Sequence, residues 1–165
     1  MKTETELQRQ IKRLANLLQT QDYKMATAES CTGGLIAKAA TDLAGSSNWF
    51  DRALITYSNQ AKIDLLSVSA DTLDKYGAVS QEVVYEMIDG LMSDAAYSMG
   101  VAVSGIAGPG GGSIEKPVGT VWIAWKFLAC DVCSRCFQFS GDREQVRIQA
   151  AIAAVEGLIE YLEDD

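Results

Sequence analysis

The sequence predicts an α/β protein, a three-layer α/β/α sandwich built around one mixed sheet. Through the first two-thirds of the chain, segments with helical apolar spacing alternate with short apolar runs typical of buried strands. Two neighbouring runs at 118–127 and 132–139 then predict an antiparallel hairpin. A final apolar repeat from 148 to 162 predicts a long closing helix.

The first elements follow from apolar spacing. Residues 4–20 are predicted to form a helix whose buried face is Leu7, Ile11, Leu14 and Leu18. A short strand is expected at 24–29 and a second helix at 33–44. The buried stripe of that helix is predicted to be Leu35, Ala39 and Leu43. A break at 45–48 leads into a strand within 49–57.

Three serines mark the starts of the next helices. Ser58 is the expected cap of a helix over 59–66, and Ser69 that of a short helix ending near residue 77. Ser80 starts a longer helix, with an expected buried face of Val84, Met87, Ile88, Leu91 and Met92. A buried strand at 100–104 precedes a glycine-rich loop. No repeat or linker interrupts the chain, so we expect a single domain over residues 1–165.

Composition excludes several classes of protein. The net charge of −8 argues against nucleic-acid binding, because phosphate contacts need a basic surface. No run approaches the roughly 20 apolar residues of a membrane span, and the N-terminal segment has no apolar signal-peptide core, so we expect a cytoplasmic protein. The absence of histidine removes Ser-His-Asp and Cys-His mechanisms. A base must then be a carboxylate, a tyrosine or a desolvated lysine.

The cysteines do not predict a metal site. Cys130, Cys133 and Cys136 are spaced by three, but a tetrahedral site needs four ligands and Cys31 lies far away in the sequence. In β-structure, a spacing of three places neighbouring side chains on opposite faces. We therefore expect free thiols, no bound metal and no cofactor.

The segment AESCTGG at 28–34 places small polar side chains at a strand-to-helix junction. Ligands of open α/β sheets bind outside the carboxyl ends of strands. Unpaired N–H groups at the helix start, with the Thr32 hydroxyl, can hold an oxyanion beside Ser30. Gly33 and Gly34 allow a close approach of the backbone. The alternative is that Ser30 or Thr32 is only a helix cap.

A serine nucleophile needs a base, and the segment YSNQAK at 57–62 contains Lys62. This segment is also a strand end and a helix start, so it should open on the same sheet edge as Ser30. Burial can yield a neutral lysine, and a Ser–Lys pair supports acyl transfer without histidine. The alternative is a solvated surface lysine, with Tyr57 as a core or edge aromatic residue.

The glycine-rich loop at 105–113 follows a third strand and can cradle a phosphate through backbone N–H groups. It matches neither a P-loop nor a dinucleotide fingerprint. Arg143 and Arg147, one turn apart at the start of the last helix, can reach an anionic group. The alternative is a surface ion pair with Asp142 or Glu144.

Together these segments resemble the C-terminal domain of the competence/damage-inducible protein CinA. The resembling segments are TAESCTGGLIAKAATDLAGSS, YSNQAK, YGAVS, VSGIAGPGGGSIEKPVGTVW and FSGDREQVR, within residues 27–147. The resemblance implies a three-layer domain that self-associates, with a dimer expected, and that needs no metal. It also implies hydrolysis of nicotinamide mononucleotide (NMN) to nicotinic acid mononucleotide and ammonia.

The resemblance also implies roles for residues. The catalytic residues that it implies are Ser30, Lys62, Tyr57 and Thr32, with Ser30 as nucleophile and Lys62 as its base. The substrate-binding residues that it implies are Gly33, Gly34, Asn59, Gly105, Gly108, Gly110, Gly112 and Arg143.

Two other functions stay open at this level. A catalytically inactive relative that binds a pyridine nucleotide would need the same glycine loop and arginine. A hydrolase of another small amide on a phosphorylated scaffold would keep the same serine and lysine. An assay of ammonia release from NMN separates these functions.

Overall fold

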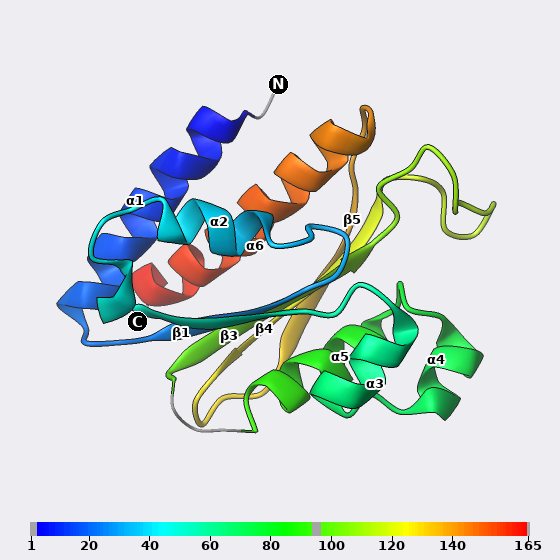
Figure 1. The fold of residues 1–165 in the computed structure, drawn as a ribbon, viewed down its shortest axis with the longest axis horizontal. Coiled ribbons are helices and arrows are strands. Elements are labelled where there is room, and N and C mark those ends of the chain that lie inside the picture. Colours follow the sequence, from blue (N-terminus) through cyan, green and yellow to red (C-terminus); the bar gives the residue numbers. More distant parts are fainter. Residues whose placement is uncertain (1–2, 94–96, 165) are drawn as a thin grey trace.

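The computed structural model describes residues 3–93 and 97–164. Its centre is a five-stranded sheet with the strand order β2-β1-β3-β4-β5 (Figure 1). The strands are β1 (Met25–Glu29), β2 (Phe50–Ile55), β3 (Met99–Gly105), β4 (Thr120–Phe127) and β5 (Cys133–Gln138). Helices cover both faces of this sheet, which confirms the predicted three-layer sandwich.

The helices divide into two layers (Figure 1). One face carries α1 (Glu4–Thr20), α2 (Leu35–Thr41) and α6 (Arg143–Asp164), so helices from both ends of the chain lie together. The other face carries α3 (Asn59–Leu66), α4 (Ala70–Tyr76) and α5 (Gln81–Leu91). A short 3-10 helix, η1 (Ser46–Asn48), leads into β2. Among the described residues, no helix has both the length and the apolar character required to cross a membrane.

Strand direction explains where a site can form. β1 is parallel to both of its neighbours, with Glu29 opposite Ile55 of β2 and Val103 of β3. β3, β4 and β5 are antiparallel, which makes the sheet mixed as predicted. The chain leaves β1 towards β2 on one side and reaches β3 on the other. Such a reversal opens a crevice at the carboxyl ends of the strands.

The apolar faces predicted for α1, α5 and α6 are buried, because α5 and α6 pack against the sheet and α1 packs against α6 and α2. The face predicted for α2 is only partly correct. Its buried residues are Ile36, Ala39 and Ala40, whereas Leu35 and Leu43 are half-buried. Leu35 lies on the side of α2 that faces α1, where it lines a shallow polar groove with Gln8.

Two of the three serine caps are confirmed. Ser58 Oγ accepts the N–H of Ala61 at 3.0 Å, and Ser80 Oγ accepts the N–H of Val83 at 3.3 Å. Ser69 occupies the N-cap position of α4, but its side chain makes no capping hydrogen bond.

The alternative interpretation, in which Ser30 or Thr32 caps α2, is wrong. The helix begins at Leu35, after a turn in which Gly33 and Gly34 have φ of +58° and +92°. These left-handed angles suit glycine. The N-cap residue is Gly34, which has no side chain to satisfy the first N–H groups of the helix.

The carboxylate of Glu29 takes that role. Glu29 is 0% exposed, and its two oxygens accept the N–H groups of Gly34, Ile36 and Ala37 at 3.0, 3.2 and 3.0 Å. The Thr27 hydroxyl donates a fourth hydrogen bond to it at 3.1 Å. A negative charge at a helix N-terminus is favourable, and here it is fully hydrogen-bonded. The donors that the sequence offered to an oxyanion are therefore already occupied.

We predict that Glu29→Gln lowers the free energy of unfolding by about 3 kcal/mol, since the amide nitrogen would face backbone N–H groups and leave buried donors unpaired. Urea denaturation measures the change. The control is Glu82→Gln, which alters an exposed glutamate in the first turn of α5 and should cost only a few tenths of that value. Equal stability of wild type and Glu29→Gln would contradict the capping role.

Candidate active site

Two groups separated by 32 positions in the sequence meet at the carboxyl end of β1. Ser30 directly follows β1, and Lys62 extends from α3 so that its Nζ lies 2.9 Å from Ser30 Oγ. Lys62 Nζ also donates to the carbonyl oxygen of Thr56 at 2.7 Å. Both side chains are buried, with Lys62 1% and Ser30 7% exposed. The alternative of a solvated surface lysine is therefore wrong.

Burial changes the acid–base properties of this pair. It lowers the pKa of Lys62 from its ordinary value to about 8, because the ammonium form is poorly solvated. A neutral amine has one lone pair, and the hydrogen bond to Thr56 leaves that lone pair free to face Ser30. In this geometry a neutral Lys62 can accept the proton of the Ser30 hydroxyl at mildly alkaline pH.

Burial has the opposite consequence for Cys31, the residue next to Ser30. It raises the pKa of the Cys31 thiol to about 12, because the thiolate would be desolvated. The reactive form of cysteine is the thiolate. At neutral pH this side chain stays a thiol packed near Gly105, which supports serine rather than cysteine as the nucleophile.

A cavity of ≈ 230 Å³ opens beside the serine and lysine. It is lined by Ser30, Cys31, Tyr57, Asn59, Lys62, Ala78, Val79, Ser104, Gly105, Ala107 and Arg143. The segments after β1, β2 and β3 all contribute, as the shared strand-end pattern indicated. This cavity contains six of the residues named from the sequence: Ser30, Tyr57, Asn59, Lys62, Gly105 and Arg143.

Four lining residues were not named individually as site residues: Ala78, Val79, Ser104 and Ala107. Ser104 and Ala107 belong to the predicted segment at the end of the third strand, whereas Ala78 and Val79 were not expected in the site. Ser104 Oγ donates to the carbonyl oxygen of Ala78 at 2.7 Å, which joins the end of β3 to the loop before α5. For Ala78 and Val79 the available signal was the segment YGAVS, which carried part of the resemblance, but neither residue has a side chain that suggests chemistry on its own.

Arg143 connects two sides of the cavity mouth. Its Nη1 donates to the carbonyl oxygen of Gly108 at 2.7 Å, and its Nη2 donates to the Tyr57 hydroxyl at 2.8 Å. Tyr57 is 60% exposed, so its ring lies at the opening rather than in the core. The guanidinium thereby holds the glycine-rich loop beside the end of β2.

Other predicted site residues lie outside this cavity. Thr32 is fully buried, and its hydroxyl has no hydrogen-bond partner among the described residues. Gly33 and Gly34 form the turn that precedes α2. Gly110 and Gly112 line a separate open hollow in the loop over 109–118. The structure therefore groups the serine, lysine, tyrosine and arginine, but not every glycine.

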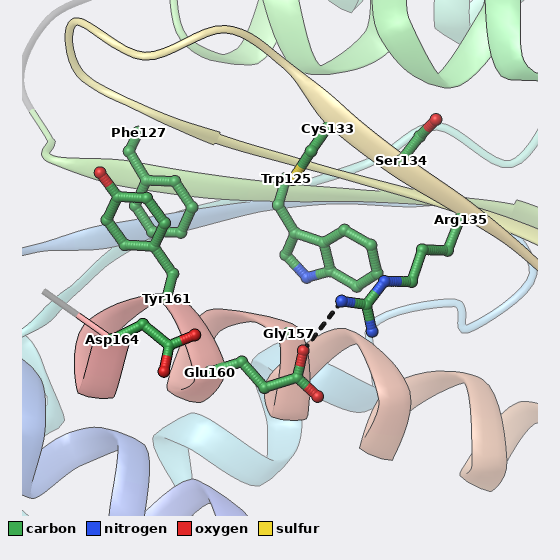
Figure 2. Close-up of a pocket in the computed structure, with 9 residues that line it drawn as sticks. All are labelled: Trp125, Phe127, Cys133, Ser134, Arg135, Gly157, Glu160, Tyr161 and Asp164. Carbon is green, nitrogen blue, oxygen red and sulfur yellow. Dashed lines mark hydrogen bonds and ion pairs between the residues drawn. The ribbon is translucent and has the colours of Figure 1, made fainter.

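Another hollow, of ≈ 220 Å³, lies between the β4–β5 hairpin and α6 (Figure 2). Trp125, Phe127 and Tyr161 form its aromatic wall. Arg135 extends over the Trp125 ring and bonds to Glu160 at 3.0 Å, so this arginine already has its partners. The Ser30–Lys62 pair is not part of this hollow.

The cysteines of the hairpin form no cluster. Cys133 lines the hollow over α6, and Cys136, three residues further along β5, is directed to the opposite face. Cys130 lies in the turn rather than in β-structure, with its Sγ 3.0 Å from the Tyr161 hydroxyl. All four cysteines are free. Among residues 3–93 and 97–164, no group of three or more potential ligand side chains could hold a metal ion.

Comparisons with known proteins identify the family of this chain. The sequence pattern of the CinA C-terminal domain matches residues 7–162. The chain is 56% identical over 139 residues to the nicotinamide-nucleotide amidohydrolase PncC of Enterobacter agglomerans, covering 84% of this chain and 85% of that protein. It is 47% identical over 156 residues to the protein of the same name from Escherichia coli K12, covering 94% of each.

Solved structures show the same fold. A CinA superfamily protein from Klebsiella pneumoniae superposes with a TM-score of 0.91 at 37% identity, covering 96% of this chain and 99% of that one. The competence/damage inducible protein CihA from Agrobacterium tumefaciens gives a TM-score of 0.91 at 40% identity, covering 95% of each chain.

We predict that iodoacetamide at pH 8 modifies Cys130, Cys133 and Cys136 of the folded protein but spares Cys31. The three hairpin thiols are exposed, whereas Cys31 is 5% exposed and has a pKa near 12, so its reaction should be more than about 100-fold slower. Mass spectrometry of peptides identifies the modified residues, and urea-unfolded protein is the control. Rapid modification of Cys31 would contradict its burial as a thiol.

Proposed function

The chain belongs to the CinA C-terminal domain family, and from this membership and the site geometry we propose that it hydrolyses NMN to nicotinic acid mononucleotide and ammonia. The observation that carries the proposal is the 2.9 Å separation of Lys62 Nζ and Ser30 Oγ in a buried site open to a cavity. The amidohydrolase relatives that cover most of the chain support the carboxamide as the reacting group.

The first half of the reaction is acylation. Ser30 Oγ attacks the carboxamide carbon, and the neutral amine of Lys62 accepts the hydroxyl proton. The resulting ammonium then donates that proton to the departing nitrogen as the C–N bond breaks. Ammonia leaves, and the nicotinoyl group remains as an ester of Ser30.

The second half is hydrolysis of this ester. A water molecule attacks the ester carbon while Lys62, neutral again, accepts its proton. The C–O bond to Ser30 breaks, the proton returns to Ser30 Oγ, and the free acid leaves. Lys62 performs the proton transfers of both halves of the reaction from one position, which the hydrogen bond to Thr56 maintains.

The cavity size suits one part of this substrate. Pockets that enclose whole drug-sized ligands span roughly 300–1,000 Å³. The ≈ 230 Å³ cavity therefore suits the planar ring with its carboxamide, while the ribose phosphate lies at the mouth. Arg143, beside Tyr57 and the glycine-rich loop, is the cation placed to attract that phosphate.

The remaining expectations are part of the same proposal. A single sheet that carries α1 and α6 on one face supports one domain over residues 1–165. Self-association as a dimer, independence of metals and a cytoplasmic location stay predictions from the sequence and the family resemblance.

We predict that Ser30→Ala and Lys62→Met each lower kcat for ammonia release from NMN by about 10³-fold or more, because each removes one half of the nucleophile–base pair. A coupled ammonia assay measures the rate. Matched controls are Ser93→Ala and Lys38→Met, which alter an exposed serine after α5 and an exposed lysine of α2 and should leave the rate unchanged.

An unchanged rate in Ser30→Ala would remove serine as the nucleophile. Stabilisation of the wild-type protein by NMN in a thermal-shift measurement, without ammonia release, would instead favour a nucleotide-binding relative that lacks activity.

We predict that kcat/KM for NMN increases with pH and levels off above about 8. The pKa of Lys62 is lowered to about 8, so the base is protonated and inactive below that pH and neutral above it. The initial rate between about pH 6 and pH 10 checks this. A rate that falls as pH rises through 8 would mean that the ammonium form is required.

A further inference from the structure

Arg147 of α6 reaches across the interface with α2 to the turn that carries Ser30. Its Nε donates to the carbonyl oxygen of Cys31 at 3.0 Å, and its Nη2 donates to that of Thr32 at 2.9 Å. The guanidinium fork therefore binds two successive backbone carbonyls, 116 and 115 positions away in the sequence. The sequence suggested an anion contact for this residue, but these two donors are engaged with protein backbone.

The turn is shaped to admit this guanidinium. A Cβ atom at Gly33 would lie 3.3 Å from Arg147 Nη2, so a larger residue there would crowd the side chain. Gly33 also has φ of +58°, which turns the chain back towards α2. One glycine thus provides both the turn and the space that the arginine occupies.

The backbone before and after these two carbonyls is held by other bonds. The N–H of Ser30 donates to the carbonyl oxygen of Val103 at 3.0 Å, which ties the turn to β3. The buried carboxylate of Glu29 holds the N–H groups that start α2. Arg147 holds the middle of the turn, between these two sets of hydrogen bonds, from the α6 side.

We propose that Arg147 is a positioning residue that fixes the Ser30 turn by binding the carbonyls of Cys31 and Thr32. It keeps Ser30 Oγ at hydrogen-bonding distance from Lys62 Nζ and acts on the reaction only through that contact. The inference rests on the proposed function, in which Ser30 is the nucleophile. A displacement of about 1 Å at a reacting atom can cost about 100-fold in rate.

Arg143 provides an internal comparison. It lies one helical turn before Arg147 on α6, but it lines the cavity, whereas Arg147 does not. Loss of a substrate contact mainly raises KM, whereas a misplaced nucleophile mainly lowers kcat. Replacement of Arg143 should therefore mainly raise KM, whereas replacement of Arg147 should mainly lower kcat.

The test uses NMN hydrolysis and a second readout that does not depend on NMN. Diisopropyl fluorophosphate forms an O–P bond with an activated serine and releases fluoride, while Lys62 takes the hydroxyl proton. For Arg147→Gln we expect kcat and the Ser30 labelling rate each to fall by about 100-fold, with KM within about threefold of wild type. Intact mass and peptide mapping follow the labelling.

Two further variants keep the inference testable if Arg147→Gln does not fold. Arg147→Lys keeps the charge but loses the fork, so we expect about a tenfold fall in both rates. In Arg147→Ala, millimolar guanidinium chloride should restore part of the labelling rate. Arg135→Gln is the matched control, because this exposed arginine bonds to Glu160 of α6 and should leave both rates within about twofold of wild type.

The possible outcomes are distinct. Wild-type rates of Ser30 labelling in both Arg147→Gln and Arg147→Lys would overturn the inference, and so would a rise in KM with kcat unchanged. If wild type releases no ammonia from NMN but Ser30 labelling still depends on Arg147, the proposed function fails and the positioning role stands.

Discussion

The buried carboxylate of Glu29 fixes the turn on which the rest of the site depends. A charge with no exposure to solvent is stable only when every lone pair has a partner, and here one hydroxyl and three N–H groups provide them. The three N–H groups belong to the start of α2, so the carboxylate ties the end of β1 to that helix. Ser30, the next residue, is thereby held at the crevice between β2 and β3.

The same burial makes two neighbouring side chains behave in opposite ways. A low-polarity environment disfavours the charged form of any group. For Lys62 the charged form is the acid, so burial yields a base with a pKa of about 8. For Cys31 the charged form is the thiolate, so burial keeps this side chain a thiol beside Ser30, the nucleophile that we propose. In a chain without histidine, the buried position of this lysine is what makes it the candidate for the base in the proposed reaction.

Two arginines of α6 contact different parts of the site: Arg143 lies at the mouth of the cavity, and Arg147 binds the turn after Ser30. Arg143 spans from the glycine-rich loop to Tyr57, at the opening where the polar end of a substrate would lie. Arg147, one turn later, binds backbone carbonyls beneath the serine. The final helix therefore contributes side chains to the site from the layer of helices on one face of the sheet. Its apolar face is nevertheless typical of a helix that only packs against the core.

Local features of the sequence were sufficient for the fold class, the apolar faces of α1, α5 and α6, and the caps at Ser58 and Ser80. Each depends on composition or on residues within a turn or two of each other. Tertiary structure alone decided that Lys62 contacts Ser30, that Glu29 rather than a hydroxyl caps α2, and that Arg147 binds the turn. The reason is physical: the carboxyl ends of β1, β2 and β3 come together at one edge of the sheet only when the sheet forms. A side chain's partners and solvation, and hence its pKa, do not exist before that edge is assembled.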